Sequence, residues 1–205
     1  MKNYIPALIA LLASIVMSSA NASIIVENGD AGETLTEAQI IIGGIDFITG
    51  NIDNDADLFR FYWSGGGFYA DTTGSDFDTQ LFLFDELGAG LLGNDDISTN
   101  NQDAYLEAGS LDAGLYFIGI SGFDYDPCYT DPCGINQIFK DLPLDGLHSA
   151  SLNSTTLASW NGLSVAATGS YTINFQQPII DIPEPTTFAM MALGLAGLFF
   201  RKNGV

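Results

Sequence analysis

Short runs of aromatic and β-branched residues, separated by turns rich in glycine and aspartate, recur along the middle of this 205-residue chain. Representative runs are residues 57–63 (DLFRFYW), 80–85 (QLFLFD), 114–121 (GLYFIGIS) and 169–175 (GSYTINF). Runs of this length and spacing are typical of β-strands. No stretch has a convincing amphipathic helical pattern. The sequence therefore predicts an all-β domain, a jelly-roll-like β-sandwich.

Two local patterns refine this prediction. In residues 80–85, Leu81 and Leu83 point one way and Phe82 and Phe84 the other, so we expect both faces of that strand to be covered. The SGGG sequence at 64–67 is expected to turn the chain so that residues 68–72 return as the partner of residues 57–63. Residues 124–151 are expected to be a long irregular insertion.

The first 22 residues have the pattern of a secretory signal peptide. Lys2 gives a positive start, residues 5–17 are apolar, and Ala20-Asn21-Ala22 is a small-x-small cleavage site. Removal of this segment and of a C-terminal tail leaves one domain at residues 23–182.

That domain is strongly acidic. The whole chain has a formal net charge of −20, and of its basic residues only Arg60 and Lys140 fall within 23–182. Every acidic residue except Glu184 lies there, so the domain repels nucleic acid and anionic membrane surfaces and is compatible with divalent cations. Its many aromatic residues distinguish it from a disordered acidic chain.

The two cysteines, Cys128 and Cys133, lie close together in the insertion. An exported chain meets an oxidising space, and an even number of cysteines there favours a disulfide. A metal-ligand pair or a redox motif is the alternative, and no further cysteine or nearby histidine supports it. We expect a local disulfide worth at most about 2–3 kcal/mol.

Acidic residues at expected strand ends are candidates for a calcium site. Asp53, Asp55 and Asp57 alternate, and Ca²⁺ is bound by six to eight oxygens with tolerant geometry. The segment lacks the glycine and distant glutamate of an EF-hand loop. Other acids and amides at strand ends could approach one another: Asp76, Asp78, Asn94, Asp95 and Asp96. The alternative is that these residues only form turns.

No catalytic residue is predicted. His148, the single histidine, lies in the insertion and has no nucleophile motif beside it. A pair of carboxylates for glycoside hydrolysis is a further alternative. Trp63, Trp160, Tyr69 and Tyr129 could stack on sugar rings, although aromatic residues are more often part of the core. Because Trp160-Asn161-Gly162 reads as a turn, Trp160 is the best candidate for an exposed stacking residue.

The last part of the chain combines a rigid break at Pro183-Glu184-Pro185, an uncharged apolar run at 188–200 and the basic pair Arg201-Lys202. As a helix the run would span about 20 Å, less than the ~30 Å of a bilayer core. This order of parts resembles the PEP-CTERM sorting tail of exported bacterial proteins. The resemblance implies a C-terminal hydrophobic helix that inserts transiently in the membrane and is removed by an exosortase-type protease. A permanent membrane anchor is the alternative.

A second resemblance covers roughly residues 43–123, with 169–175 as the last strand. The segments DADLFRF at 55–61, SDFDTQLFLFD at 75–85, LLGNDD at 91–96 and LDAGLYFIGISG at 111–122 resemble the bacterial pre-peptidase C-terminal domain family. The resemblance implies a jelly-roll sandwich without catalytic activity, in some members binding calcium or polymeric ligands. The insertion at 124–151 departs from the family pattern.

These observations lead to one leading hypothesis and two alternatives. The first is a non-enzymatic exported protein of the cell surface or extracellular matrix (biofilm), processed by an exosortase and associated with exopolysaccharide. The second is a carbohydrate- or polymer-binding module with loops stabilised by Ca²⁺. The third is a secreted hydrolase.

Overall fold

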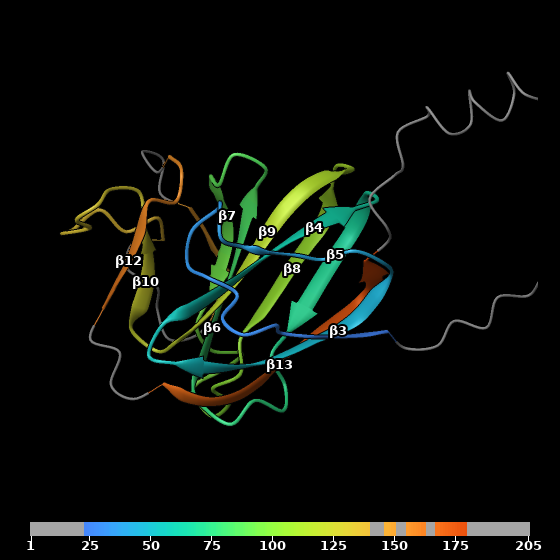
Figure 1. Ribbon diagram of the computed structural model, residues 1–205, viewed down its shortest axis with the longest axis horizontal. Helices are drawn as coiled ribbons and strands as arrows, with labels where there is room; N and C mark the ends of the chain where they lie inside the picture. Colours follow the sequence, from blue (N-terminus) through green and yellow to red (C-terminus); the bar gives the residue numbers. More distant parts are fainter. Residues whose placement is uncertain (1–22, 140–145, 151–154, 163–166, 180–205) are drawn as a thin grey trace, which may run out of the picture.

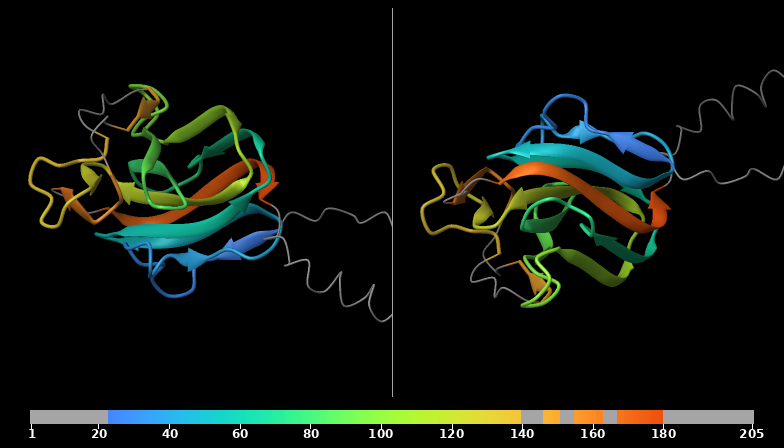
Figure 2. Two further views of the ribbon diagram at one scale, coloured as in Figure 1. Left: turned by 90° about the horizontal axis from the view of Figure 1, so that it is seen from above. Right: turned by 90° about the horizontal axis from the view of Figure 1, so that it is seen from below.

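The computed structural model describes residues 23–139, 146–150, 155–162 and 167–179, which form strands, turns and loops (Figure 1). Two mixed sheets pack as a sandwich, and Figure 2 shows these layers from two sides. The expected all-β sandwich is therefore confirmed. The expected signal peptide and the expected C-terminal helix lie outside the described residues. Within the described part, no helix is long and apolar enough to cross a membrane.

One sheet has five strands, and its order is β1 (Ile24–Val26), β3 (Ile45–Asp53), β13 (Thr168–Ile179), β5 (Gly66–Asp71) and β8 (Tyr105–Leu111). Strand β1 runs parallel to β3, and the other neighbours are antiparallel. The central pairing of β3 with β13 joins the beginning of the domain to its end, as expected for a last strand near residues 169–175.

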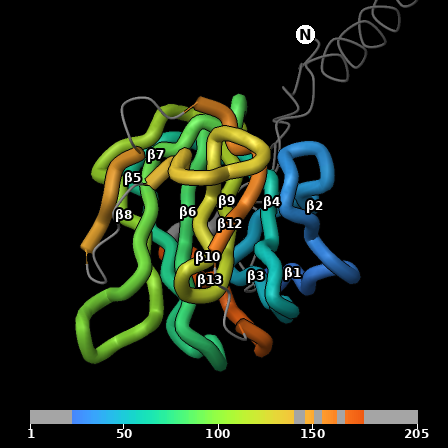
Figure 3. The backbone as a smooth tube through the Cα atoms, turned by 90° about the vertical axis from the view of Figure 1, so that its left-hand side faces the viewer, coloured from blue at the N-terminus to red at the C-terminus, as the bar shows by residue number. Residues whose placement is uncertain are grey.

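The other sheet has six strands, in the order β11 (His148–Ser149), β7 (Gly90–Asn94), β6 (Thr79–Asp85), β9 (Gly114–Gly122), β4 (Ala56–Trp63) and β2 (Gln39–Ile40). Strand β2 runs parallel to β4. A separate ribbon pairs β10 (Tyr125–Cys128) with β12 (Ser159–Gly162). Figure 3 shows this ribbon in front of β6 and β9.

The space between the two sheets is filled by large apolar side chains. Phe59, Phe61 and Trp63 of β4 alternate inward. Phe61 and Trp63 both contact Phe68 of β5. On β13, Phe175 contacts Phe61 and Tyr171 contacts Phe59. Burial of side chains this large is the main favourable contribution to folding, about 1.5–3 kcal/mol for each.

A second hydrophobic cluster lies on the other face of the six-stranded sheet. Phe82 and Phe84 of β6 point away from the inter-sheet core and pack against Phe139 and Trp160. Leu81 and Leu83 belong to the inter-sheet core. The expectation that both faces of this strand are covered is confirmed.

One expected pairing is wrong. Strands β4 and β5 do not form a hairpin, because β4 pairs with β9 and β2 whereas β5 pairs with β13 and β8. Gly65 and Gly66 both have positive φ angles of 94° and 101°, which are accessible to glycine at little cost. The connection between β4 and β5 runs through these two glycines and carries the chain from one sheet to the other.

Candidate metal centre

The hairpin formed by β6 and β7 brings distant acidic residues together. Its turn is held by Asp85, whose Oδ1 accepts the backbone N–H groups of Leu87 and Ala89, each at 2.9 Å. The resulting register places Leu81 opposite Asn94. Asp78 precedes the first strand of the hairpin, and Asp95 and Asp96 follow the second. Antiparallel pairing thus puts these three residues at one end of the six-stranded sheet.

We call Asp78, Asp95 and Asp96 the acidic triad. Each residue offers one carboxylate oxygen, and these three atoms all lie within 4.8 Å of one another. Asp95 and Asp96 are buried, with exposed fractions of 2% and 6%, and Asp78 is half-buried. The Oδ1 atoms of Asp78 and Asp95 are buried and have no hydrogen-bond partner among the described residues. Such carboxylate oxygens suit a hard divalent cation.

The electrostatics of the triad point the same way. Burial, with repulsion from Asp96 and then from Asp78, raises the pKa of Asp95 to about 7. Burial and repulsion from Asp96 raise the pKa of Asp78 to about 6, although a hydrogen bond from Gln102 partly offsets the rise. The triad therefore disfavours its own ionised state unless a positive charge lies between the carboxylates.

A loop after β7 frames the triad and gives access to it. Its ends are joined by the Ile97 N–H, which donates to the Asp103 carbonyl at 2.7 Å. Gln102 donates through Nε2 to Oδ2 of Asp78 at 2.5 Å. The loop borders a pocket of about 440 Å³ lined by Asp78, Asp96, Thr99, Asn100, Gln102 and Phe123. Two members of the triad, Asp78 and Asp96, thus line a pocket at the surface, and Asp95 lies buried beside them.

Three other predicted acids, Asp53, Asp55 and Asp57, lie at a second acidic pocket of about 260 Å³. Its full lining is Glu27, Gly29, Asp30, Asn51, Asp53, Asp55 and Asp57. Asp57 is 1% exposed, and its Oδ2 has no hydrogen-bond partner of good geometry in the described part of the chain. Burial raises the pKa of Asp57 to about 7, the nearby Tyr171 hydroxyl partly offsets this, and Glu27 and Asp55 add to it. The alternation of Asp53, Asp55 and Asp57 does place all three at one pocket.

Two predicted ligands have other roles. Asp76 accepts a hydrogen bond from the Ser170 hydroxyl and so ties the loop before β6 to β13. Asn94 accepts the Tyr105 N–H through Oδ1 at 2.8 Å and donates through Nδ2 to the carbonyls of Asp96 and Gly146. Asn94 therefore shapes the backbone around the triad, and its amide oxygen is engaged elsewhere.

The disulfide between Cys128 and Cys133 is present, with a Cα–Cα distance of 5.4 Å. The expectation that Trp160 is exposed is wrong. Trp160 is only 8% exposed, packs in the second hydrophobic cluster and donates through Nε1 to the Glu33 carbonyl at 2.8 Å. Gly119 lies beneath its ring, since a Cβ there would meet Trp160 at 3.1 Å. The turn-like sequence Trp160-Asn161-Gly162 is instead strand β12.

Sequence reasoning missed Glu27 and Asp30 at the second acidic pocket. Both residues lie near the N-terminus of the described chain, and only the pairing of β1 with β3 brings them close to Asp53. Glu27 accepts the N–H groups of Ala31 and Asn51, at 3.1 and 2.8 Å, and thereby holds this segment against β3. The acid-glycine-acid pattern of residues 27–30 was the one available clue.

Comparison with known families identifies one part of the chain. Residues 181–203 match the PEP-CTERM protein-sorting motif. This motif is typical of exported proteins that are sorted to the cell surface and processed by an exosortase. The expectation based on Pro183-Glu184-Pro185 and the apolar run after it is therefore confirmed at the level of the motif. No curated protein matches the chain.

Proposed function

We propose that this protein is a non-enzymatic component of the cell surface or of the extracellular polymer matrix, delivered there after an exosortase removes its tail. The match of residues 181–203 to the sorting motif is the observation that carries the proposal. The acidic all-β sandwich is the part that would remain after processing. Its resemblance to pre-peptidase C-terminal domains supports a jelly-roll of that type, whose members generally lack catalytic activity.

The intact mass of the exported protein tests this delivery route. We expect a species that begins at Ser23 and ends near the sorting motif, without Arg201 and Lys202. Deletion of 183–205 should abolish sorting to the surface, because the protease then has nothing to recognise. A mature protein that keeps both basic residues and remains embedded in a membrane would show that the tail is a permanent anchor.

The absence of catalysis is also part of the proposal. His148, the single histidine, pairs in β11 with β7, and its Nε2 has no hydrogen-bond partner among the described residues. Among the described residues no nucleophile hydroxyl is thus paired with this nitrogen, as a Ser-His-Asp triad would require, which supports the proposal. Incubation of the exported protein with matrix polysaccharides should release no reducing ends. Release that depends on the carboxylates of Asp78 and Asp95 would favour the hydrolase alternative.

We further propose that Ca²⁺ occupies the acidic triad and stabilises the loops around it. Three close carboxylates with buried, unpartnered oxygens on Asp78 and Asp95 support this. Calcium completes its shell of six to eight oxygens with carbonyls and water. Binding only to the folded state at 100 times Kd would add about 2.7 kcal/mol to the free energy of unfolding.

Thermal unfolding with and without calcium tests this site. Millimolar Ca²⁺ should raise Tm by roughly 5–10 °C relative to chelator. In Asp95→Asn much of this rise should be lost, because the variant removes a ligand charge and keeps the side-chain size. Asp112→Asn is the control, since it removes the same charge from the exposed turn between β8 and β9. Equal calcium shifts in both variants would exclude the triad.

A further inference from the structure

The outer face of the five-stranded sheet has an aromatic surface that the acidic triad and the sorting tail do not use. Tyr69 of β5 and Tyr105 of β8 both point away from the sandwich core and remain half-buried. Their ring centroids lie 6.3 Å apart at an angle of 29°. Two nearly parallel rings on a strand pair form a broad apolar step, of the kind on which sugar rings stack.

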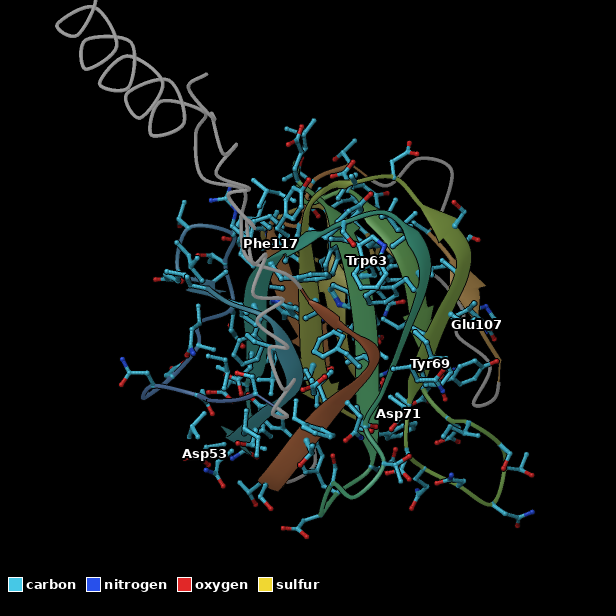
Figure 4. All side chains as sticks on the ribbon, turned by 90° about the vertical axis from the view of Figure 1, so that its right-hand side faces the viewer. Asp53, Trp63, Tyr69, Asp71, Glu107 and Phe117 are labelled. Atoms are coloured by element: carbon cyan, nitrogen blue, oxygen red, sulfur yellow. A yellow bond between two sulfur atoms is a disulfide. The ribbon has the colours of Figure 1, made fainter. Side chains whose placement is uncertain are left out.

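Polar side chains flank both rings. Strand pairing places Tyr69 opposite Glu107 and Asp71 opposite Tyr105. Figure 4 shows Tyr69, Asp71 and Glu107 on one side of the molecule, away from Asp53. Asp71 is held in place by Asn174, which donates to its Oδ1 at 2.8 Å. The exposed carboxylate of Glu107 therefore lies beside Tyr69, and the carboxylate of Asp71 lies beside Tyr105.

A groove continues from Tyr69 along the two strands. It encloses about 380 Å³ and is lined by Gly67, Phe68, Tyr69, Glu107, Ala108, Gly109 and Gln176. At Gly109 the groove is open, since a Cβ there would project into space with no atom within 4 Å. The surface of the two tyrosine rings is thus continuous with a groove that can hold an extended polymer chain. Glu107 and Gln176 line this groove and can form hydrogen bonds with the polymer.

The charge of this face selects among polymers. Repulsion from Asp71 and Glu107, after the larger effect of burial, raises the pKa of the Tyr69 hydroxyl. Arg60 is the only lysine or arginine in the described part of the chain, and it lies over the Phe117 ring on the other sheet. An anionic polysaccharide would be repelled, whereas protonated amines on a sugar chain would be attracted.

We propose that the outer face of β5 and β8 binds a pyranose polymer that carries free amino groups. The rings of Tyr69 and Tyr105 stack on the sugar faces, and Glu107 pairs with an amine. The inference deepens the proposed matrix association by naming a ligand class, and it rests on that proposal only for its biological setting. The contact itself depends on neither calcium nor tail processing.

Calorimetric titration of the exported protein with a glucosamine hexamer, at mildly acidic pH, tests the proposal. The hexamer should bind, and its fully N-acetylated form should bind at least about tenfold more weakly, because acetylation removes the charge. Tyr69→Ala and Tyr105→Ala should each weaken binding about tenfold or more, as expected for aromatic contact residues. Gly109→Val should block the groove without straining the backbone.

Matched variants separate this site from general attraction between an acidic protein and a cationic oligomer. Glu107→Gln should weaken binding, whereas Asp112→Asn, which removes one exposed charge elsewhere, should not. Tyr62→Ala removes a half-buried tyrosine from β4 of the other sheet and should also leave binding unchanged. Melting curves establish that each variant is folded.

Three outcomes would overturn the inference: no binding, equal binding of the acetylated and free-amine hexamers, or full binding by a folded Tyr69→Ala variant. The readout is separate from that of the delivery route. A protein that binds but keeps its tail contradicts only the proposed function, and a processed protein that does not bind contradicts only this inference.

Discussion

At the scale of single residues, the described part of the domain buries carboxyl groups that have no lysine or arginine partner among the described residues. Asp126 in β10 is 8% exposed, and it accepts hydrogen bonds from the Nε2 atoms of Gln80 and Gln137, at 3.2 and 2.5 Å. Burial raises the pKa of Asp126 to about 6, Gln80 and Gln137 partly offset this, and Asp124 adds to it. Neutral amides thus take the place that lysine or arginine has in less acidic proteins.

Asp126→Asn should flatten part of the pH dependence of stability. The folded pKa of about 6 exceeds the ordinary 3.8, so the folded state binds this proton more tightly than the unfolded chain does. The contribution of the group is complete below about pH 3.8 and is lost as the pH rises through about 6. The free energy of unfolding of the variant, measured relative to the wild type, should therefore rise by on the order of 2 kcal/mol between pH 4 and pH 7.

The measurement is urea unfolding between pH 4 and 7 in chelator, with Asp112→Asn as the control for a lost surface charge. Both variants and the wild type should be compared at equal ionic strength. Identical pH profiles for Asp126→Asn and the wild type would contradict the assignment of this titration to Asp126.

At the scale of elements, the insertion at 124–151 contributes side chains to the second hydrophobic cluster. Phe139 is fully buried and stacks on Phe82, with ring centroids 5.4 Å apart. Strand β7 presents glycines where the insertion lies closest. A Cβ at Gly90 would approach Ile138 to 2.3 Å, and one at Gly93 would approach Phe139 to 3.0 Å. The insertion and the sheet are therefore fitted to each other.

Phe139→Ala should lower the free energy of unfolding by about 3–5 kcal/mol, because it leaves a cavity over β6 and β7. Ile135→Ala, in the same segment but at a residue that is 84% exposed, should change it by less than about 0.5 kcal/mol. Chemical denaturation measures both. A loss at Phe139 no larger than that at Ile135 would mean that the insertion does not contribute a core.

These elements also show what a sequence can and cannot predict here. The acidic triad was within reach, because an antiparallel hairpin must bring Asp78 near Asp95 and Asp96. The packing of the insertion on the sheet could not be predicted. Gly90 and Gly93 have the composition of turn residues, and nothing in the sequence indicates that side chains of the insertion pack on them. The prediction that Trp160 is exposed was wrong for the same reason, because Gly119 does not indicate that a ring packs on it. The predicted pairing of β4 with β5 was wrong because a local turn sequence does not determine which sheet the next strand joins.

At the scale of the whole molecule, the net charge of −20 opposes compaction. The resolved shifts in carboxyl pKa are all upward, for Asp57, Asp78, Asp95, Asp103 and Asp126, and burial is the leading cause of each. Repulsion between carboxylates adds to each of these shifts. The domain should therefore be sensitive to any agent that screens or neutralises negative charge.

Monovalent salt should stabilise the protein even without calcium. Raising NaCl from about 0.01 to about 0.5 M shortens the screening length from about 30 Å to a few ångströms, so Tm in chelator should rise by a few degrees. Asp95→Asn should retain this rise while losing the calcium response. If Tm falls or stays constant with added NaCl, self-repulsion is not a significant cost for this fold.

Ser23, the residue that the sequence predicts to follow the signal-peptide cleavage site, lies at the edge of the five-stranded sheet, directly before β1. Its backbone nitrogen lies 2.9 Å from Oδ2 of Asp46, and its carbonyl accepts the N–H groups of Asp46 and Phe47. Cleavage after Ala22 would turn that amide into a free ammonium group facing the Asp46 carboxylate. Cleavage at the predicted site would thereby create an ion pair that fixes the start of the first strand, in a domain whose basic side chains are only those of Arg60 and Lys140.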